Sequence, residues 1–204
     1  MQDNHLLILD LLDFSNPDHF YFVQILKRRK DNPNMEKDMS PIASEYIKSS
    51  GYFLEIWPTL KSLADSTNAR VYIRMNPCSF KRNAFETLSA IAKRISEEEY
   101  SSIHTVYESV CGKFQDNSNK KWIVDIDYKE AGEMSFENIS KYCSKVLNYV
   151  ENAIKETGRE PNMKLVPTKN GLHILCNPFR LDKFKNDWPK IDIHKSATTL
   201  IYCP

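Results

Sequence analysis

Asp125 and Asp127 are the two residues whose type and spacing most clearly suggest chemistry. They end the run Ile123-Val-Asp-Ile-Asp127, in which apolar residues alternate with the acids as they do in a β-strand. Side chains two positions apart in a strand point to the same side, so the two carboxylates should lie close together. Two like charges that close need a compensating cation, and carboxylate oxygens suit Mg²⁺ or Mn²⁺ with substrate phosphates as further ligands. The alternative is a solvated strand end, in which the acids lie beside Lys121 and Lys129.

A second group of polar side chains lies in the run Leu165-Val-Pro-Thr-Lys-Asn-Gly-Leu-His-Ile-Leu175. Its Lys-Asn-Gly sequence predicts a tight turn between two strands. The turn brings polar side chains together with free backbone amides, a combination that can hold a polyphosphate. A lone histidine in an apolar strand is more often a satisfied core residue, and that alternative applies to the histidine here. The candidate residues of this group are Thr168, Lys169, Asn170 and His173, with Gly171 contributing its backbone amide.

A third acid, Asp192, stands between Ile191 and Ile193, as an acid displayed from a strand would. It is equally well explained as a surface aspartate beside Lys190 and Lys195. Taken alone, it therefore carries no functional prediction.

A helix and several strands must position these groups. Ser135 suits the start of a helix that runs from about 135 to 157, and Gly158 suits its end. Apolar periodicity predicts the surrounding strands over residues 121–128, 162–167, 172–176 and 198–203.

The first part of the chain shows longer apolar patterns. Val71, Ile73 and Met75 alternate with polar residues and predict a strand over 69–76. An amphipathic helix is predicted over 84–99, with the apolar set Phe85, Leu88, Ile91, Ala92 and Ile95. Two more helices are predicted over residues 18–30 and 40–66.

Four consecutive cations end the first of these predicted helices. They are suited to the negative end of a helix dipole, and they are equally suited to binding a phosphate backbone. The cations are Lys27, Arg28, Arg29 and Lys30.

Helices and strands in this order predict an α+β fold, with a mixed or antiparallel sheet flanked by helices rather than a doubly wound parallel sheet. The chain of 204 residues is long enough for one sizeable core. We expect a single unit in two halves, about 1–115 and about 116–204, separated by a polar loop over about 112–120.

The composition narrows the function classes. The net charge of +1 excludes a polycation that binds nucleic acid over its whole surface, so any such contact must come from a local patch. The five cysteines are scattered and predict neither a zinc site nor a disulfide framework. With no signal peptide and no apolar run of membrane-spanning length, we expect a cytoplasmic protein without membrane contact.

Three stretches in this order resemble the archaeo-eukaryotic primase superfamily, which includes the primase-polymerases. That family has an apolar strand ending in Asp-x-Asp or Asp-x-Glu, a helix, a strand with a polar turn leading to Gly-x-His, and a later apolar-Asp pair. The matching runs here are Val124-Asp-Ile-Asp127, Gly171-Leu-His173 and Ile191-Asp192. The resemblance covers roughly residues 120–204 and is to reduced, phage-encoded members, with Thr168 where the family has a serine.

The resemblance implies a primase-like core, with an RRM-like half joined to an N-terminal α/β half. It implies a template-directed nucleotidyltransferase in which Asp125, Asp127 and Asp192 hold Mg²⁺ or Mn²⁺. His173 would hydrogen-bond nucleotide phosphates, and Lys169, Asn170 and Lys195 would neutralise the leaving pyrophosphate. Nucleoside triphosphates, a DNA or RNA template and a helicase or other replication protein are the implied partners. The implied template path is lined by the cations of residues 27–30 and by Arg74, Lys81 and Arg82.

Two other functions fit the same residues. A metal-dependent nuclease also uses two or three carboxylates with a lysine and a histidine. A non-catalytic factor could keep the fold and bind nucleic acid or a protein. Incubation with a primed template, a divalent metal and nucleotides separates extension from shortening.

Overall fold

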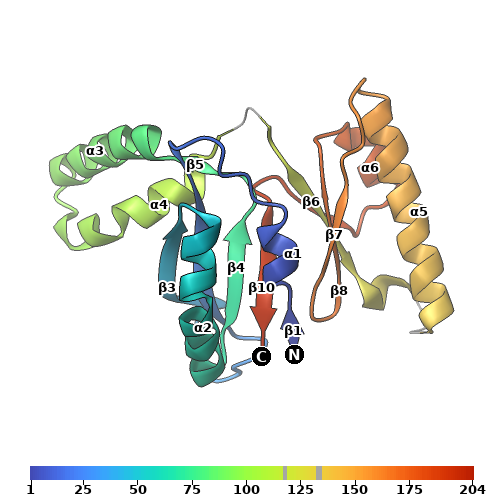
Figure 1. The fold of residues 1–204 in the computed structure, drawn as a ribbon, viewed down its shortest axis with the longest axis horizontal. Coiled ribbons are helices and arrows are strands. Elements are labelled where there is room, and N and C mark those ends of the chain that lie inside the picture. Colours follow the sequence, from blue (N-terminus) through green and yellow to red (C-terminus); the bar gives the residue numbers. More distant parts are fainter. Residues whose placement is uncertain (117–118, 132–134) are drawn as a thin grey trace.

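The computed structural model describes residues 1–116, 119–131 and 135–204. Two antiparallel sheets stand side by side, with helices on their outer faces (Figure 1). This arrangement belongs to the predicted α+β class. The prediction allowed a mixed or an antiparallel sheet, and both sheets are antiparallel. Within the described residues, no helix is long and apolar enough to cross a membrane.

The first sheet has the strand order β1-β10-β4-β2-β3, with the short β5 paired to β2. Its central strands are rich in aromatic and β-branched residues, which suit a pleated surface covered on both sides. The strands are β1 (Gln2–Asp3), β2 (His19–Arg28), β3 (Met39–Ile47), β4 (Arg70–Arg74), β5 (Cys78–Ser79) and β10 (Thr198–Cys203).

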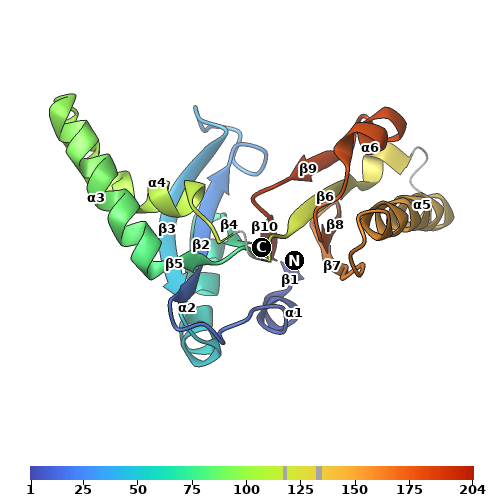
Figure 2. The ribbon, with the colours of Figure 1, turned by 90° about the horizontal axis from the view of Figure 1, so that it is seen from above.

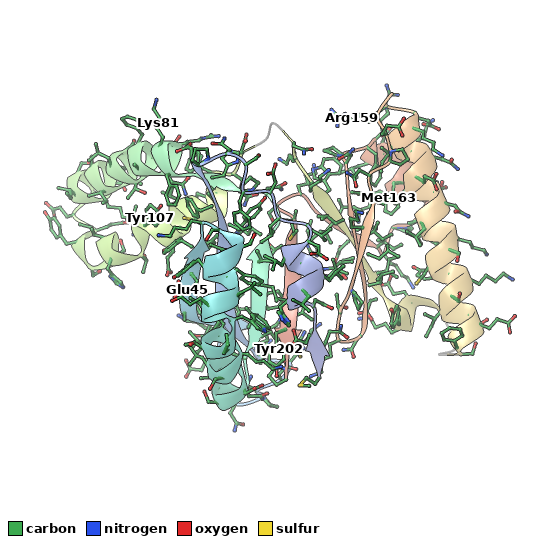
Figure 3. All side chains as sticks on the ribbon, viewed as in Figure 1. Glu45, Lys81, Tyr107, Arg159, Met163 and Tyr202 are labelled. Atoms are coloured by element: carbon green, nitrogen blue, oxygen red, sulfur yellow. The ribbon has the colours of Figure 1, made fainter. Side chains whose placement is uncertain are left out.

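Helices cover one face of this sheet and one end of the other face. One face packs on α2 through Phe53, Trp57 and Leu60, and Tyr202 of β10 donates a hydrogen bond of 2.6 Å to Asp65 of that helix (Figure 3). The aromatic end of the other face, at Phe20, packs against α4. The helices of this half are α1 (His5–Leu9), α2 (Ser50–Thr67), α3 (Phe80–Ser96), the 3₁₀ turn η1 (Tyr100–Thr105) and α4 (Val106–Lys113).

The second sheet has the order β7-β8-β6-β9, and its chain order is strand, helix, two strands, helix, strand. This is the split β-α-β arrangement, in which the first and third strands pair at the centre. Its elements are β6 (Trp122–Asp127), the 3₁₀ turn η2 (Tyr128–Ala131), α5 (Phe136–Lys155), β7 (Lys164–Pro167), β8 (Gly171–Cys176), α6 (Leu181–Asp187) and β9 (Asp192–His194).

The alternation of β6 divides its side chains between two environments. Val124 and Ile126 pack against the apolar stripe of α5, which includes Val146 and Val150. Ile123, on the opposite face, packs into the core of the first sheet. Asp125 and Asp127 share the face of Ile123 and therefore point toward the first sheet, as their spacing predicts.

Buried asparagines join the two sheets. Asn76, just after β4, donates to the carbonyl oxygen of Lys121 at 2.9 Å and accepts from its backbone amide at 2.7 Å. Asn4 donates to the carbonyl oxygens of Pro167 and Leu200, which belong to different sheets. Buried amides of this kind fix one relative position of the sheets, because each broken bond would leave a desolvated polar group.

The chain passes from the first sheet to the second between α4 and β6, where the predicted loop over 112–120 lies, although residues 117–118 fall outside the described residues. The predicted division of the chain into two halves at about residue 116 does not describe the last strand. The last strand, β10, returns to the first sheet and pairs with both β1 and β4.

The predicted helix over 18–30 is wrong, because these residues form β2. Tyr21, Val23 and Ile25 are buried on one face of the strand, and the aromatic and branched side chains fit a central strand better than a helix. The predicted helix over 40–66 is wrong in its first part, which forms β3, and right in its second part, which forms α2. The four cations therefore end a strand and begin a hairpin.

The predicted helix over 84–99 exists, but it begins earlier, at Phe80 with Ser79 as its N-cap. Its apolar side chains do not all reach the core. Phe85 is 66% exposed and Leu88 is 67% exposed, so this face of α3 is turned to solvent.

Candidate functional site

Three of the predicted site residues stand in one row across the second sheet. Asp125 at the centre of β6 is the register partner of His173 on β8 and of Asp192 on β9. Directly opposed residues in antiparallel strands have Cβ atoms about 4.5–5.5 Å apart and share a face of the sheet. Two residues that lie 48 and 67 positions further along the chain thus converge on Asp125, which the separate strand patterns could not show.

Both oxygens of Asp125 face imidazole rings. Nε2 of His173 lies 3.3 Å from Oδ1, and Nε2 of His194 lies 3.4 Å from Oδ2. Burial alone would raise the pKa of Asp125, but the hydrogen bonds and charges of the two histidines outweigh burial and hold it well below its usual value. The hydrogen bond to Asp125 in turn raises the pKa of His194.

The two histidine rings differ in exposure and in how firmly hydrogen bonds hold them. His173 is 11% exposed, and its Nδ1 lies 2.9 Å from the hydroxyl oxygen of Thr199, a buried residue of β10. A proton on Nε2 lets the ring donate to Asp125 while Nδ1 accepts from that hydroxyl, so neutral His173 satisfies both contacts. The His194 side chain is 44% exposed and its ring makes no other hydrogen bond within the described residues, so the ring can turn away.

The other two carboxylates are less constrained. Asp127 forms an ion pair with Lys129, in which Nζ of the lysine lies 2.9 Å from Oδ2 of the aspartate. Asp192 is exposed and makes no ion pair or hydrogen bond with a described residue. Two aspartates opposed in register repel one another unless a positive charge stands between them. His194, whose pKa is raised by its hydrogen bond to Asp125, can supply part of that charge.

Gly171 fixes how closely β8 approaches β6. A Cβ atom placed there would lie 2.0 Å from the carbonyl oxygen of Ile126, so only glycine allows this pairing beside Asp127. The turn before it is held by the amide of Thr168, which donates to the carbonyl oxygen of Gly171 at 3.0 Å. Asn170 accepts from the amide of Tyr128, which ties the turn to the end of β6.

Lys169 is paired in this structure. Its ammonium lies 3.0 Å from Asp31, in the β2–β3 hairpin of the first sheet, and Asp31 also accepts a bidentate pair from Arg70. Arg70 and Lys169 together hold the pKa of Asp31 below its usual range. This contact joins the two sheets at one end of the site.

A cleft of about 730 Å³ lies between the sheets, a size typical of small-ligand sites. The row of Asp125, His173 and Asp192 forms one wall, and the polar faces of β2, β4 and β10 form the other. Figure 2 shows β9 and the β2–β3 hairpin on the same side of the molecule, with α1 and α2 on the opposite side. Seven cations and four carboxylates line the cleft, so its charge favours an anionic ligand.

Arg74 is the least compensated of these cations. Its Nε is buried without a hydrogen-bond partner, and its guanidinium makes no ion pair with a described residue. Burial therefore lowers its pKa. A desolvated guanidinium with unused donors needs an anion, and phosphate oxygens match its geometry. Arg28, which donates to the hydroxyl of Tyr72 at 3.1 Å, also lacks an acidic partner within the described chain.

The cleft collects most of the predicted site residues. Those that line it are Asp125, Asp127, Asp192, His173, Thr168, Lys169, Asn170, Gly171, Arg74, Arg28 and Lys30. Lys27 and Arg29 do not, because alternation along β2 turns them away, and Arg29 pairs with Asp38 instead. Lys81 lies on the outer side of α3 (Figure 3). Arg82 and Lys195 line a separate, smaller pocket.

The sequence interpretation missed three residues of the site. Arg70 and Tyr72 lie on the polar face of the strand over 69–76, so its alternation already contained the signal for them. Thr199 carried no signal, because its contact with His173 depends on how the two sheets meet.

The donor chemistry of the site suits a divalent cation. Oxygen ligands from Asp125, Asp127 and Asp192 are those that Mg²⁺ and Mn²⁺ take, and an exposed Asp192 beside Asp125 leaves negative charge to be neutralised. Among the described residues, no three acidic, histidine or cysteine side chains already stand in a metal-binding arrangement. A metal ion held by Asp125 would replace the present contact of that carboxylate with His194.

Comparison of the chain with protein-family models, curated proteins and solved structures gave no match.

Proposed function

We propose that this protein is a metal-dependent nucleotidyltransferase of the primase-polymerase type, which adds nucleotides to a strand under the direction of a template. The observation that carries the proposal is the composition of the cleft, with Asp125 and Asp192 on one wall and the unpaired Arg74 on the other. The carboxylates need cations and the guanidinium needs an anion. A metal-bound nucleoside triphosphate supplies both.

The topology of the second sheet supports the proposal. The resemblance to primases implies an RRM-like half with its acids on a central strand, and the split β-α-β arrangement has Asp125 and Asp127 on the central β6. The same resemblance implies a histidine on the neighbouring strand and a third acid further along. His173 and Asp192 flank Asp125 in register, although they lie on opposite sides of it in the sheet.

The carboxylates would act by holding the cations in place. When bound, two divalent ions would activate the 3′-hydroxyl of a primer and neutralise the triphosphate. Asp125 and Asp192 would hold the metal, and Asp127 would join them if its carboxylate exchanged Lys129 for a cation. His194 would release Asp125, because its ring is the more exposed of the two imidazoles and has no second hydrogen-bond partner among the described residues.

His173 and Arg74 would act on the phosphates. Thr199 holds the ring of His173 through Nδ1, so its Nε2–H donor keeps its position when Asp125 turns to a metal. That donor would then serve a phosphate oxygen. Arg74 approaches from the opposite wall and would bind the phosphates in the two-pronged manner of a guanidinium.

The direct test is extension of a primed template with nucleoside triphosphates and Mg²⁺ or Mn²⁺. The Asp192→Asn variant should fold normally, because Asp192 is exposed and unpaired, and should lose at least about 100-fold in extension rate, roughly 2.7 kcal/mol of barrier. The matched control is Asp182→Asn, which removes one exposed carboxylate from the nearby α6. Equal activity of both variants would remove Asp192 from the mechanism.

The same assay separates the rival functions. Shortening of the primer without extension would indicate a metal-dependent nuclease built on the same carboxylates. If calorimetry detects neither metal nor nucleotide binding, and if replacing Asp125 and Asp127 by Asn leaves the biological effect unchanged, the protein is a non-catalytic binding factor.

A further inference from the structure

A second pocket, of about 210 Å³, opens where the segment after α4 approaches the loop between β9 and β10. Its four charged residues are all cations: Arg82, Lys113, Lys120 and Lys195. No acid is among the described residues that line it. Ser196 lines both this pocket and the large cleft, so the two are neighbours. We call it the basic pocket.

The cations of the basic pocket are available to a ligand. Lys113, Lys120 and Lys195 make no ion pair within the described residues, and Arg82 has only a 3.9 Å approach to Glu86 along its own helix. Arg82 and Lys195 instead lie over aromatic rings, those of Phe114 and Trp122, at 5.2 and 5.4 Å. Four like charges around one hollow repel each other unless an anion joins them.

A buried amide points to the same kind of ligand. Gln115 is only 8% exposed, lines the basic pocket and makes no hydrogen bond with a described residue. The amide keeps contact with solvent in the pocket, so its hydrogen-bonding capacity is open to a ligand there. The NH₂ group of Gln115 can donate two hydrogen bonds, which suits the oxygens of an anion surrounded by cations.

The size and the aromatic lining of the pocket indicate which kind of anion it fits. The volume lies below the roughly 300–1,000 Å³ typical of pockets that enclose a whole small ligand, so the pocket suits a backbone phosphate better than a complete nucleoside triphosphate. Cations interleaved with an aromatic ring, here Phe114, form the kind of groove that binds single-stranded nucleic acid.

We propose that the basic pocket binds the phosphate backbone of a single-stranded nucleic acid as it leaves the large cleft. The direction of the strand rests on the proposed function, because that function places the template in the cleft. The backbone binding itself rests on the lining of the basic pocket, which consists of its four cations, Phe114 and Gln115.

Fluorescence anisotropy with a labelled 16-nucleotide oligothymidylate, measured in EDTA over a series of salt concentrations, tests the proposal. The double variant Lys113→Ala/Lys120→Ala should bind roughly 10- to 30-fold more weakly near 0.1 M salt. The slope of log affinity against log salt should be shallower by about 1.4, because each single-strand phosphate contact contributes about 0.7. A parallel oligouridylate titration shows whether the strand is DNA or RNA.

The matched control is Lys141→Ala/Lys145→Ala, which removes two exposed lysines from α5, on the side of the second sheet away from the cleft. This control should keep the affinity and the slope of the unaltered protein. Equal losses in both double variants would show a general charge effect and overturn the proposal. Unchanged binding in Lys113→Ala/Lys120→Ala, with circular dichroism showing a folded protein, would also overturn it.

Two further measurements identify the source of the phosphate and separate the two proposals. Tripolyphosphate should bind the unaltered protein and Lys113→Ala/Lys120→Ala equally, whereas a selective loss would assign the pocket to a free triphosphate and overturn strand binding. The metal-free binding assay is independent of catalysis. A protein that never extends a primer, yet loses strand binding on Lys113→Ala/Lys120→Ala, would contradict the proposed function and retain this one.

Discussion

At the scale of single residues, the site depends on contacts that bring different strands together at Asp125. His173 reaches it from β8 and His194 from β9, while Thr199 of the other sheet orients His173. A strand pattern indicates which face a side chain takes, but the neighbour across the sheet depends on register. The Asp-x-Asp pair was therefore predictable from spacing, whereas its two histidine partners required the paired strands.

Gly171 gives a prediction at this scale. Replacing it by Ala would press a methyl group against the carbonyl oxygen of Ile126 and force β8 away from β6. We expect a loss of about 1–3 kcal/mol in the free energy of unfolding, in the range of overpacked sites. Urea unfolding measures it.

Gly51 of α2 is the matched control, because a Cβ there meets nothing within 4 Å. Gly51→Ala should leave stability unchanged or raise it by up to about 1 kcal/mol, since alanine restricts the unfolded chain. If both substitutions have the same effect, the close approach of β8 to β6 is not what requires glycine.

At the scale of elements, the second sheet was predicted better than the first. The alternation that defines β6, the Ser135 cap of α5 and the turn before Gly171 are local signals, and each element formed where expected. The first half of β2 is buried on both faces, so its sequence lacks the period that separates a strand from a buried helix. Packing against other elements therefore determined whether these residues form a strand or a helix.

The helix α3 gives a second prediction. Its apolar face suggested core packing, yet Leu88 is largely exposed whereas Leu60 of α2 is buried. Leu88→Ala should therefore change the free energy of unfolding by less than about 0.5 kcal/mol. Leu60→Ala should cost about 2–5 kcal/mol, because it leaves a cavity in the core. A large loss for Leu88→Ala would show that this face is covered in solution.

At the scale of the whole molecule, the cleft exists because two sheets are held in one relative position. The sequence predicted two halves but not their connections, which are long-range contacts such as those of Asn76 with Lys121. Asp31 makes another such contact, since it binds Arg70 of its own sheet and Lys169 of the other.

The paired carboxylate of Asp31 leads to a prediction of how the free energy of unfolding depends on pH. Its pKa is lowered in the folded protein, so its contribution to stability is fully present above its unfolded value of about 3.9 and is lost as the pH falls below it. Asp31→Asn should lower the free energy of unfolding at pH 7 by about 2 kcal/mol. It should also reduce the loss on acidification to pH 3, measured by urea unfolding at both values.

Asp38→Asn is the matched control, because Asp38 pairs with Arg29 at an exposed position. Exposed ion pairs contribute little, so this variant should differ from the unaltered protein by less than about 1 kcal/mol at either pH. An acid response of Asp31→Asn as steep as that of the unaltered protein would refute the role of Asp31.

The most direct test of the central claim is a crystal structure with Mn²⁺ and a non-hydrolysable nucleoside triphosphate. Anomalous density should appear at the roughly 2.1 Å ligand distance typical of Mg²⁺ from carboxylate oxygens of Asp125 and Asp192. His194 should have turned away, and the phosphates should reach Arg74. Density on the histidines alone, or a nucleotide bound away from an unliganded Asp192, would contradict a nucleotidyl-transfer site in this cleft.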